Sequence, residues 1–488
     1  MPRRAIFTPL ALTLAVTVAM ASSAIGQESQ DVPADAQSLQ ALEELKEPAA
    51  PDAAVQLPSL PGLFERALNN DADLARQRLE LQAVEQEKPL ARSQLLPQVT
   101  ASGNYLYQDS TNIQTSPDEF GLEQQATRPG EIDETYWQVR LQQPLFSLER
   151  WRGLRQADAQ VSAAELDLAI VERDLALKIS EAYVNAFLAS RKQGLLKAQQ
   201  ASLELQVRQA QRAYELGIGN RIDLLEAQSR LDQAIADAVQ AANELDDALS
   251  ELERLAGIRP EFQGHAIANL GTLEVSAPEG DPQAWIERTA ANLDVLRAVA
   301  ERRINQSETG IRRSGYFPEL NLNLSYSDRN SDDKLRSSED YRASVEVSVP
   351  LFRGGRTMAS VRQAELRTAA SQKAIDNQRN LAVQEVRRRL RSLDGNVRRL
   401  EALRQAIKSS ELFLAAAERG EQLGLRDLVD VLDARASLYD QRIQFVDTLG
   451  SFTMDRLTLE SAIGDLETTD LANSMSLLAS ISPGEQSR

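Results

Sequence analysis

The 488-residue chain contains no cysteine and a single histidine. Without cysteine it can form no disulfide, thiol nucleophile, iron–sulfur cluster or lipid-modified N-terminal cysteine, and one histidine excludes a multi-histidine metal centre. Aromatic residues make up only 5% of the chain, which is little for several packed cores. Acidic residues outnumber basic ones by 72 to 54, so the formal charge is −18. Because such a charge repels phosphates, we expect no nucleic-acid partner.

The N-terminus has the order of a secretory signal peptide. Arg3 and Arg4 precede an apolar stretch, residues 10–20, that is short for a membrane span, and small residues follow as far as Gly26. Cleavage near Gly26 and cleavage beside residues 19–21 both fit this pattern. We therefore predict an exported protein. No later stretch approaches the roughly 18 apolar residues of a membrane helix, so entry into a membrane would require strands.

The chain repeats one plan twice. Residues 155–157 (Arg-Gln-Ala) recur 207 positions later as residues 362–364, and Leu216-Gly217 recurs at the same offset as Leu423-Gly424. A constant offset indicates long rigid helices, because one inserted residue would turn the following helix face by about 100°.

Each copy predicts a helix, two strands, a long helix, a tight turn and a second helix. The resulting segments are a signal peptide (1–26), a flexible linker (27–58), a first-repeat helix (59–97), two strands with their loop (98–146), a helical hairpin (147–258), an inter-repeat linker (259–282), a second-repeat helix (283–317), two further strands (318–352), a second hairpin (353–464) and a C-terminal tail (465–488).

Four segments alternate apolar and polar residues, namely 99–108, 136–142, 320–326 and 344–349. This alternation is typical of outer-membrane barrel strands, although a soluble sheet with one solvated face gives the same pattern. Four strands cannot close a barrel, and open edges in a bilayer leave backbone groups unpaired. Other subunits must therefore supply strands. A trimer provides twelve and a dimer eight, and twelve leave more room for an aqueous lumen.

The long helices predict contacts on two sides. Residues 155–216 contain no proline, so a continuous helix of roughly 90 Å is possible. Apolar residues spaced i, i+2, such as Leu166 and Leu168, lie on nearly opposite sides of such a helix. This arrangement favours a helix within a wall of helices, whereas a two-helix coiled coil would show a single seam.

Three stretches resemble TolC-type outer-membrane efflux proteins: residues 92–98 (Arg-Ser-Gln-Leu-Leu-Pro-Gln), 350–356 (Pro-Leu-Phe-Arg-Gly-Gly-Arg) and 424–434 (Gly-Leu-Arg-Asp-Leu-Val-Asp-Val-Leu-Asp-Ala). The resemblance extends from about residue 63 to residue 464. It implies a mainly α-helical homotrimer with a twelve-stranded β-barrel in outer-membrane lipid and a periplasmic α-helical barrel.

The same resemblance implies a passive channel for efflux or type I secretion. Such a channel works with a periplasmic adaptor protein and an inner-membrane transporter of the ABC or RND type. Because no cysteine follows the signal peptide, the chain is nearer the unlipidated branch of the family.

The resemblance also assigns the adaptor contact to the two hairpin turns, which form the periplasmic tip: Leu216, Gly217, Ile218, Leu423, Gly424 and Leu425. A glycine is in any case the usual residue just beyond a helix C-terminus. Asp223 and Arg426 match partners with which the family holds the tip closed. Asp430 and Asp433 match acids that line the lumen as rings; acids near a helix N-terminus also stabilise the helix dipole.

Two other function classes compete with the channel. A periplasmic adaptor, or a structural coiled-coil protein of an export complex, also has long helical hairpins, but an adaptor has one hairpin where this chain repeats the plan twice. A hydrolytic enzyme finds no support, since the sequence has no nucleophile motif, metal cluster or glycine-rich phosphate loop. We therefore predict a non-enzymatic protein with no catalytic residues, cofactor or metal.

Overall fold

The computed structural model describes residues 59–109, 131–217, 219–262, 273, 275–332 and 336–481. The predicted signal peptide, the N-terminal linker, part of the inter-repeat linker and Ile218 lie outside these residues. The elements are α2 (Leu60–Asn70), α3 (Ala72–Glu85), α4 (Glu87–Ser93), β1 (Gln98–Asp109), β2 (Glu131–Phe146), α5 (Leu148–Glu215), α6 (Arg221–Ala256), α7 (Pro282–Arg288), η1 (Thr289–Ala291), α8 (Leu293–Ser314), β3 (Glu319–Ser331), β4 (Ser338–Ser348), α9 (Arg356–Gln422), α10 (Leu428–Ile463) and α11 (Thr468–Ala479).

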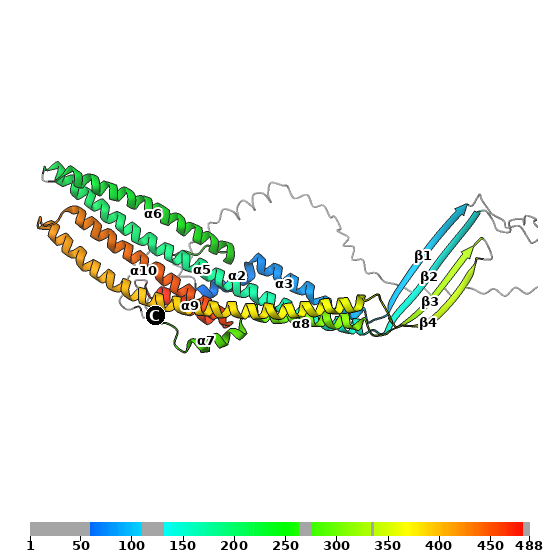
Figure 1. Cartoon of the computed structure of the whole chain (residues 1–488). Helices are drawn as coiled ribbons and strands as arrows, with labels where there is room; N and C mark the ends of the chain where they lie inside the picture. The colour runs from blue at the N-terminus through cyan, green and yellow to red at the C-terminus, as the bar shows by residue number, and fades with distance from the viewer. Residues whose placement is uncertain are drawn as a thin grey trace, which may run out of the picture. The chain divides into compact units, whose positions relative to one another are not determined.

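The sequence repeat appears as two helical hairpins of nearly equal size. Helices α5 and α6 have 68 and 36 residues, and α9 and α10 have 67 and 36. In each hairpin the short helix packs along the part of the long helix next to the turn (Figure 1). Helix α8 packs against both α5 and α9 and so joins the two repeats.

Helix α5 is continuous, as the absence of proline predicts, and Ser147 caps its N-terminus. The Ser147 hydroxyl accepts a hydrogen bond from the backbone N–H of Arg150 at 3.5 Å. The helix packs against α3, α6, α8 and α10, which confirms the expectation of neighbours on more than one side. None of the described helices is long and apolar enough to cross a membrane.

The strands form one antiparallel sheet in the order β1-β2-β3-β4. Its register places Leu141 between Val99 and Leu324, and the next such row places Val139 between Ala101 and Tyr326. The rows between them are polar. Apolar side chains therefore gather on one face of the sheet and polar side chains on the other, because successive strand residues point to opposite faces.

Two expected segments differ in the structure. The single helix expected in 59–97 is broken into α2, α3 and α4. Asp71 causes the first break because its extended backbone ends α2, while its carboxylate caps α3 by accepting from the N–H of Leu74 at 2.8 Å. The segment expected to be a tail contains α11, which packs against α2 and α10 and buries Leu471 and Leu478. A hydrophobic face on twelve residues suffices to hold this helix in place.

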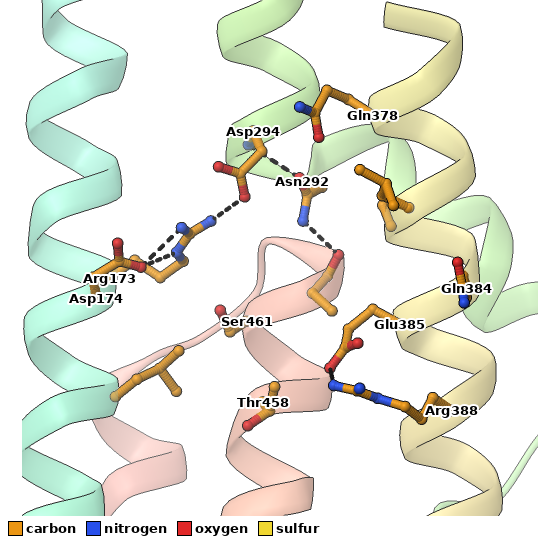
Figure 2. Close-up of a pocket in the computed structure, with 14 residues that line it drawn as sticks. Arg173, Asp174, Asn292, Asp294, Gln378, Gln384, Glu385, Arg388, Thr458 and Ser461 are labelled. Carbon is orange, nitrogen blue, oxygen red and sulfur yellow. Dashed lines mark hydrogen bonds and ion pairs between the residues drawn. The ribbon is translucent and has the colours of Figure 1, made fainter.

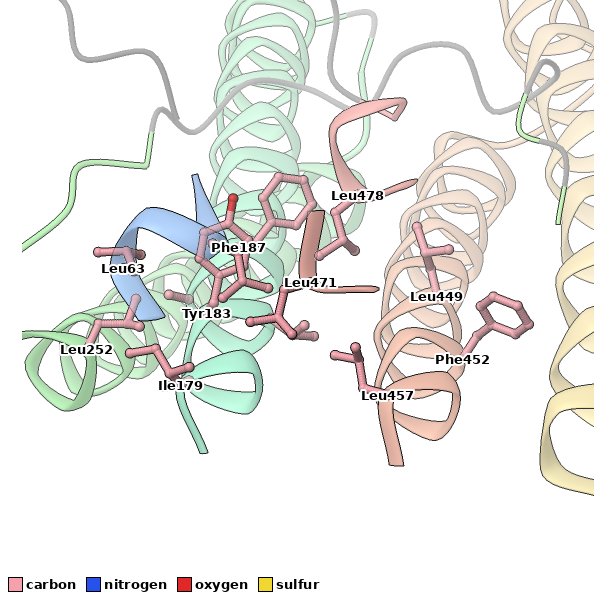
Figure 3. Packing of buried hydrophobic residues seen from close by; sticks show 14 of the residues in the cluster. Leu63, Ile179, Tyr183, Phe187, Leu252, Leu449, Phe452, Leu457, Leu471 and Leu478 are labelled. Atoms are coloured by element: carbon pink, nitrogen blue, oxygen red, sulfur yellow. The ribbon is translucent and has the colours of Figure 1, made fainter. Parts of the chain in front are cut away.

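The main hydrophobic core lies where α2, α5, α6, α9, α10 and α11 converge (Figure 3). Its largest fully buried side chains include Tyr183, Phe187, Phe445 and Phe452. Several aromatic residues thus lie where helices of both repeats meet, since aromatic side chains bury the most apolar area per residue.

A buried carboxylate links α9 to α10. Asp455 on α10 accepts hydrogen bonds from three side chains of α9: Arg389 Nη1 at 2.5 Å, Ser392 Oγ at 2.5 Å and Asn396 Nδ2 at 3.0 Å. In the first repeat, Ala248 stands at the position of Asp455, and an alanine also stands at the position of Arg389. This polar cluster is therefore a feature of the second hairpin alone.

Candidate functional site at the hairpin turns

The two hairpin turns are built alike. Gly217 and Gly424 both adopt left-handed backbone conformations, with φ of 72° and 71°, which residues with a side chain rarely adopt. After Gly424, the N–H of Leu425 bonds back to the carbonyl of Gly420 at 2.8 Å, which closes the end of α9. Helix α6 starts after Asn220, whose side chain accepts from the N–H of the second helical residue at 3.1 Å.

The turns expose leucines that were predicted to contact an adaptor. Leu216, Leu423 and Leu425 have 62%, 60% and 77% of their surface exposed. Ile222 and Leu225, at the start of α6, are also exposed. Clustered exposed apolar side chains are typical of surfaces that bind another protein. Ile218, which was also predicted to contact the adaptor, lies outside the described residues.

Arg426 is held on its own hairpin. Its Nη1 lies 3.3 Å from Asp430 Oδ2, four residues along the chain, and its guanidinium group lies 5.7 Å from the ring centre of Phe413 on α9. Within one chain the structure therefore brings Arg426 to Asp430 and not to Asp223, its predicted partner. In the described part of the chain Asp223 forms no ion pair.

An ion pair between the hairpins was not predicted. Arg230 Nη2 on α6 lies 2.6 Å from Asp433 Oδ1 on α10 and 3.7 Å from Glu226 on its own helix. The Arg230 and Asp433 side chains are 43% and 58% exposed, so the pair lies at the surface. Within one chain, each of the two predicted ring carboxylates thus has a guanidinium partner.

One sequence signal could have drawn attention to Arg230. Between the cations at the two ends of α6, Arg221 and Arg254, it is the only basic residue among many acids. Such a cation can pair with acids of its own helix or of a neighbouring helix. Its partner could not be identified, because Arg230 and Asp433 are 203 positions apart.

Charges continue along the seam between α6 and α10 at seven-residue intervals. Seven residues beyond the Arg230–Asp433 pair, Asp237 and Asp440 bring two like charges together. Two effects raise the pKa of Asp440: its partial desolvation first, and then the nearby Asp237 carboxylate. Seven residues further, Lys192 of α5 binds Glu244 at 2.8 Å, and this hydrogen bond lowers the pKa of Glu244. The seam is therefore attractive next to the turns and repulsive two helical turns further on.

A polar cavity of about 450 Å³ lies far along the chain from the turns, where α5, α8, α9 and α10 meet (Figure 2). Arg173 of α5 binds Asp294 of α8 at 2.7 Å, and Glu385 binds Arg388 on α9 at 2.8 Å. Asn292 caps α8 and donates to a backbone carbonyl at the end of α10 at 2.9 Å. These ion pairs and hydrogen bonds link helices of both repeats around the cavity.

Residues 63–258 and 287–465 match the family model described as "Outer membrane efflux protein". The chain belongs to the outer membrane efflux protein family. This membership confirms the predictions of an outer-membrane location, of a channel for efflux or type I secretion, and of a protein that is not an enzyme.

Relatives within the family include an outer membrane protein and a protease secretion protein. The chain is 27% identical to "Outer membrane protein TolC" of Vibrio cholerae, over 86% of this chain and 93% of that protein. It is 28% identical to "Alkaline protease secretion protein AprF" of Pseudomonas aeruginosa, over 77% of this chain and 78% of that protein. Among solved structures, the CmeC outer membrane channel of Campylobacter jejuni has a TM-score of 0.71 at 17% identity, over 87% of this chain and 90% of that chain. This likeness shows a shared, mostly helical fold.

Proposed function

We propose that three copies of this family member form a continuous duct, with a twelve-stranded β-barrel in the outer membrane and an α-helical barrel in the periplasm. The observation that carries this proposal is the open sheet. Within the described residues, β1 and β4 each have a strand on one side only. Unpaired edges expose rows of N–H and C=O groups, which are costly in a bilayer, and neighbouring copies can pair them.

The two faces of the sheet suit a barrel wall. The exposed apolar face would contact lipid, and its aromatic residues cluster. Trp137 and Tyr326 have ring centres 4.9 Å apart, and Tyr326 and Tyr341 have ring centres 4.6 Å apart. Aromatic girdles of this kind flank the apolar band of outer-membrane barrels. The polar face would then line an aqueous lumen, for which twelve strands leave more room than eight.

The segment assignment follows from this arrangement. Residues 98–146 and 318–352 form the barrel, and residues 147–258 and 353–464 form the periplasmic hairpins. The hairpin turns contact a periplasmic adaptor, which joins the duct to an inner-membrane transporter of the ABC or RND type. Exported drugs or proteins pass through the duct, in keeping with relatives named both for protease secretion and for efflux.

The closed tip would be held at two levels. Asp223 of one copy and Arg426 of the next provide the latch between copies, while Arg230 and Asp433 tie the two hairpins of each copy. Asp430 and Asp433 line the lumen just above the turns. Because each carboxylate already has a guanidinium neighbour, this ring attracts cations less strongly than six free carboxylates would.

The assembly can be tested with engineered cysteines, because the chain has none of its own. Within one chain β1 and β4 are separated by two strands, roughly 14 Å at the usual strand spacing, which exceeds the reach of a disulfide. Val99→Cys combined with Val345→Cys or Val347→Cys should therefore crosslink only between chains.

We expect covalent trimers on a non-reducing gel, and uncrosslinked monomers for each single-cysteine variant. Native mass spectrometry of the untreated protein should give the same stoichiometry. A stable monomer or dimer in detergent would contradict the proposed duct.

A further inference from the structure

The polar face of the sheet carries two arginines in one row of paired residues. The register pairs Thr100 with Arg140, Arg140 with Ser325 and Ser325 with Arg342, so these four residues form a single row across all four strands. Arg140 and Arg342 lie on alternate strands, about 10 Å apart at the backbone. Both side chains are exposed in the chain.

Neither arginine is neutralised within the described residues. Arg140 donates to the amide oxygen of Gln138 at 3.2 Å, and neither Arg140 nor Arg342 forms an ion pair there. The nearest acid on the same face is Asp340, two residues from Arg342, which accepts a hydrogen bond from Ser338 at 3.3 Å. This level of the sheet therefore has an excess of positive charge.

A third arginine on the same face has a different environment. Arg329 lies 3.3 Å from Glu134, whose side chain is only 9% exposed, and its guanidinium group lies 5.1 Å from the ring centre of Tyr136. Here the cation is paired and has a packing role. The contrast separates arginines that hold the sheet together from the two that remain free.

We propose that Arg140 and Arg342 form an oxyanion-binding ring inside the barrel. The inference rests on the proposed trimer, in which three copies place six guanidinium groups in one band of the lumen. Because a row of paired residues runs perpendicular to the tilted strands, Arg140 and Arg342 lie about 6 Å apart along the barrel axis. A twelve-stranded barrel with strands tilted by about 40° is about 24 Å across between backbones. Arginines projecting from that wall bring much of the lumen within one Debye length, about 8 Å at physiological salt, of a positive charge.

The chemistry of the ring selects its ligand class. A guanidinium group offers a planar fork of N–H donors that matches carboxylate and phosphate oxygens. The ring therefore attracts oxyanions, either carboxylates on the exported molecule or free phosphate from outside. A ring of cations favours anions electrostatically, as charged rings do in other channels.

The test uses the full-length trimer in planar bilayers. A salt gradient measures anion/cation selectivity, and citrate or inorganic phosphate added on the barrel side measures block of the current. In the wild type we expect both anions to reduce the current reversibly. A stronger block by citrate identifies carboxylates as the preferred ligand, and a stronger block by phosphate identifies phosphate. For the Arg140→Gln, Arg342→Gln double variant we expect about tenfold weaker block, since charge-assisted hydrogen bonds are lost, and a shift of selectivity toward cations.

Two further variants make the result specific. Arg140→Lys with Arg342→Lys keeps the charge but loses the fork, so selectivity should stay while block weakens. Arg329→Gln, which removes a paired arginine from the same face, should leave both measurements close to the wild type. Two results would overturn the proposed anion-binding ring. One is a glutamine variant that forms trimeric channels and keeps the wild-type selectivity and block, and the other is a wild-type channel that neither anion blocks. Failure to form trimers, seen by native mass spectrometry before any current is measured, would instead overturn the proposed duct on which the ring rests.

Discussion

Replacing Asp455 with alanine should destabilise the second hairpin strongly. The Asp455 side chain is 9% exposed and accepts hydrogen bonds from three residues of α9. Removing one partner of a buried ion pair costs about 3–5 kcal/mol, because the other charge is left without compensation. Arg389 is 24% exposed and keeps a second partner, Glu385, at 2.6 Å. We therefore expect the lower end of that range, about 3 kcal/mol.

The first repeat indicates that the losses from the two charged residues should not add. Since alanines occupy the positions of both charged residues there, removing both charges leaves no buried ion. Arg389→Ala alone should cost about as much as Asp455→Ala alone, and the double variant should cost about the same as either, not the sum of about 6 kcal/mol. The coupling energy between the two residues should accordingly be about 3 kcal/mol.

The assay is denaturant unfolding of the detergent-solubilised protein, followed by the helical circular dichroism signal. Lys373→Ala is a matched control on α9, because its pair with Asp376 is exposed and solvent screens it, so its loss should change stability little. Additive effects of the two single variants would refute the reasoning. They would mean that Asp455 and Arg389 stabilise the hairpin independently.

Three further predictions concern the turns and the seam. Gly424→Ala should cost about 1–2 kcal/mol of stability in the same unfolding assay, because only the left-handed backbone opposes the new side chain. Gly464→Ala should cost about 3 kcal/mol, because its new methyl group also meets the carbonyl oxygen at the end of η1. Arg230→Ser should raise the open-channel fraction about tenfold in planar bilayers if each of three copies loses about 0.5 kcal/mol, while Arg254→Ser, at the other end of α6, should leave it unchanged. Since the pKa of Asp440 is raised in the folded protein, the wild type should gain stability as the pH falls through that pKa. Asp440→Asn should be more stable than the wild type at neutral pH and should lose this advantage in acid. Equal stabilities of the two proteins at neutral pH would contradict the raised pKa.

The sequence predicted individual helices and strands well. Two of its signals are local patterns. The alternation of residues 320–326 lies within β3, and the proline-free run of residues 155–216 matches α5 to within one residue at its C-terminal end. Strand lengths were underestimated, because pairing extends β2 to 16 residues, well beyond its strictly alternating part. The positions of the two turn glycines were readable for the same local reason, since the end of each helix needs a left-handed residue.

What the sequence by itself determined is the duplicated plan, and with it the family. The constant offset of 207 residues is a property of the chain alone, and helix and strand periods follow from backbone geometry that does not depend on distant partners. Only the tertiary structure decided which charges meet. Arg230 and Asp433 lie in different repeats, and their contact depends on the rotation of α6 and α10 about their axes. The docking of α11 and the choice of Asp455 as a buried carboxylate follow the same logic, because burial is set by the neighbours that fold around a residue and not by the residues beside it in the sequence.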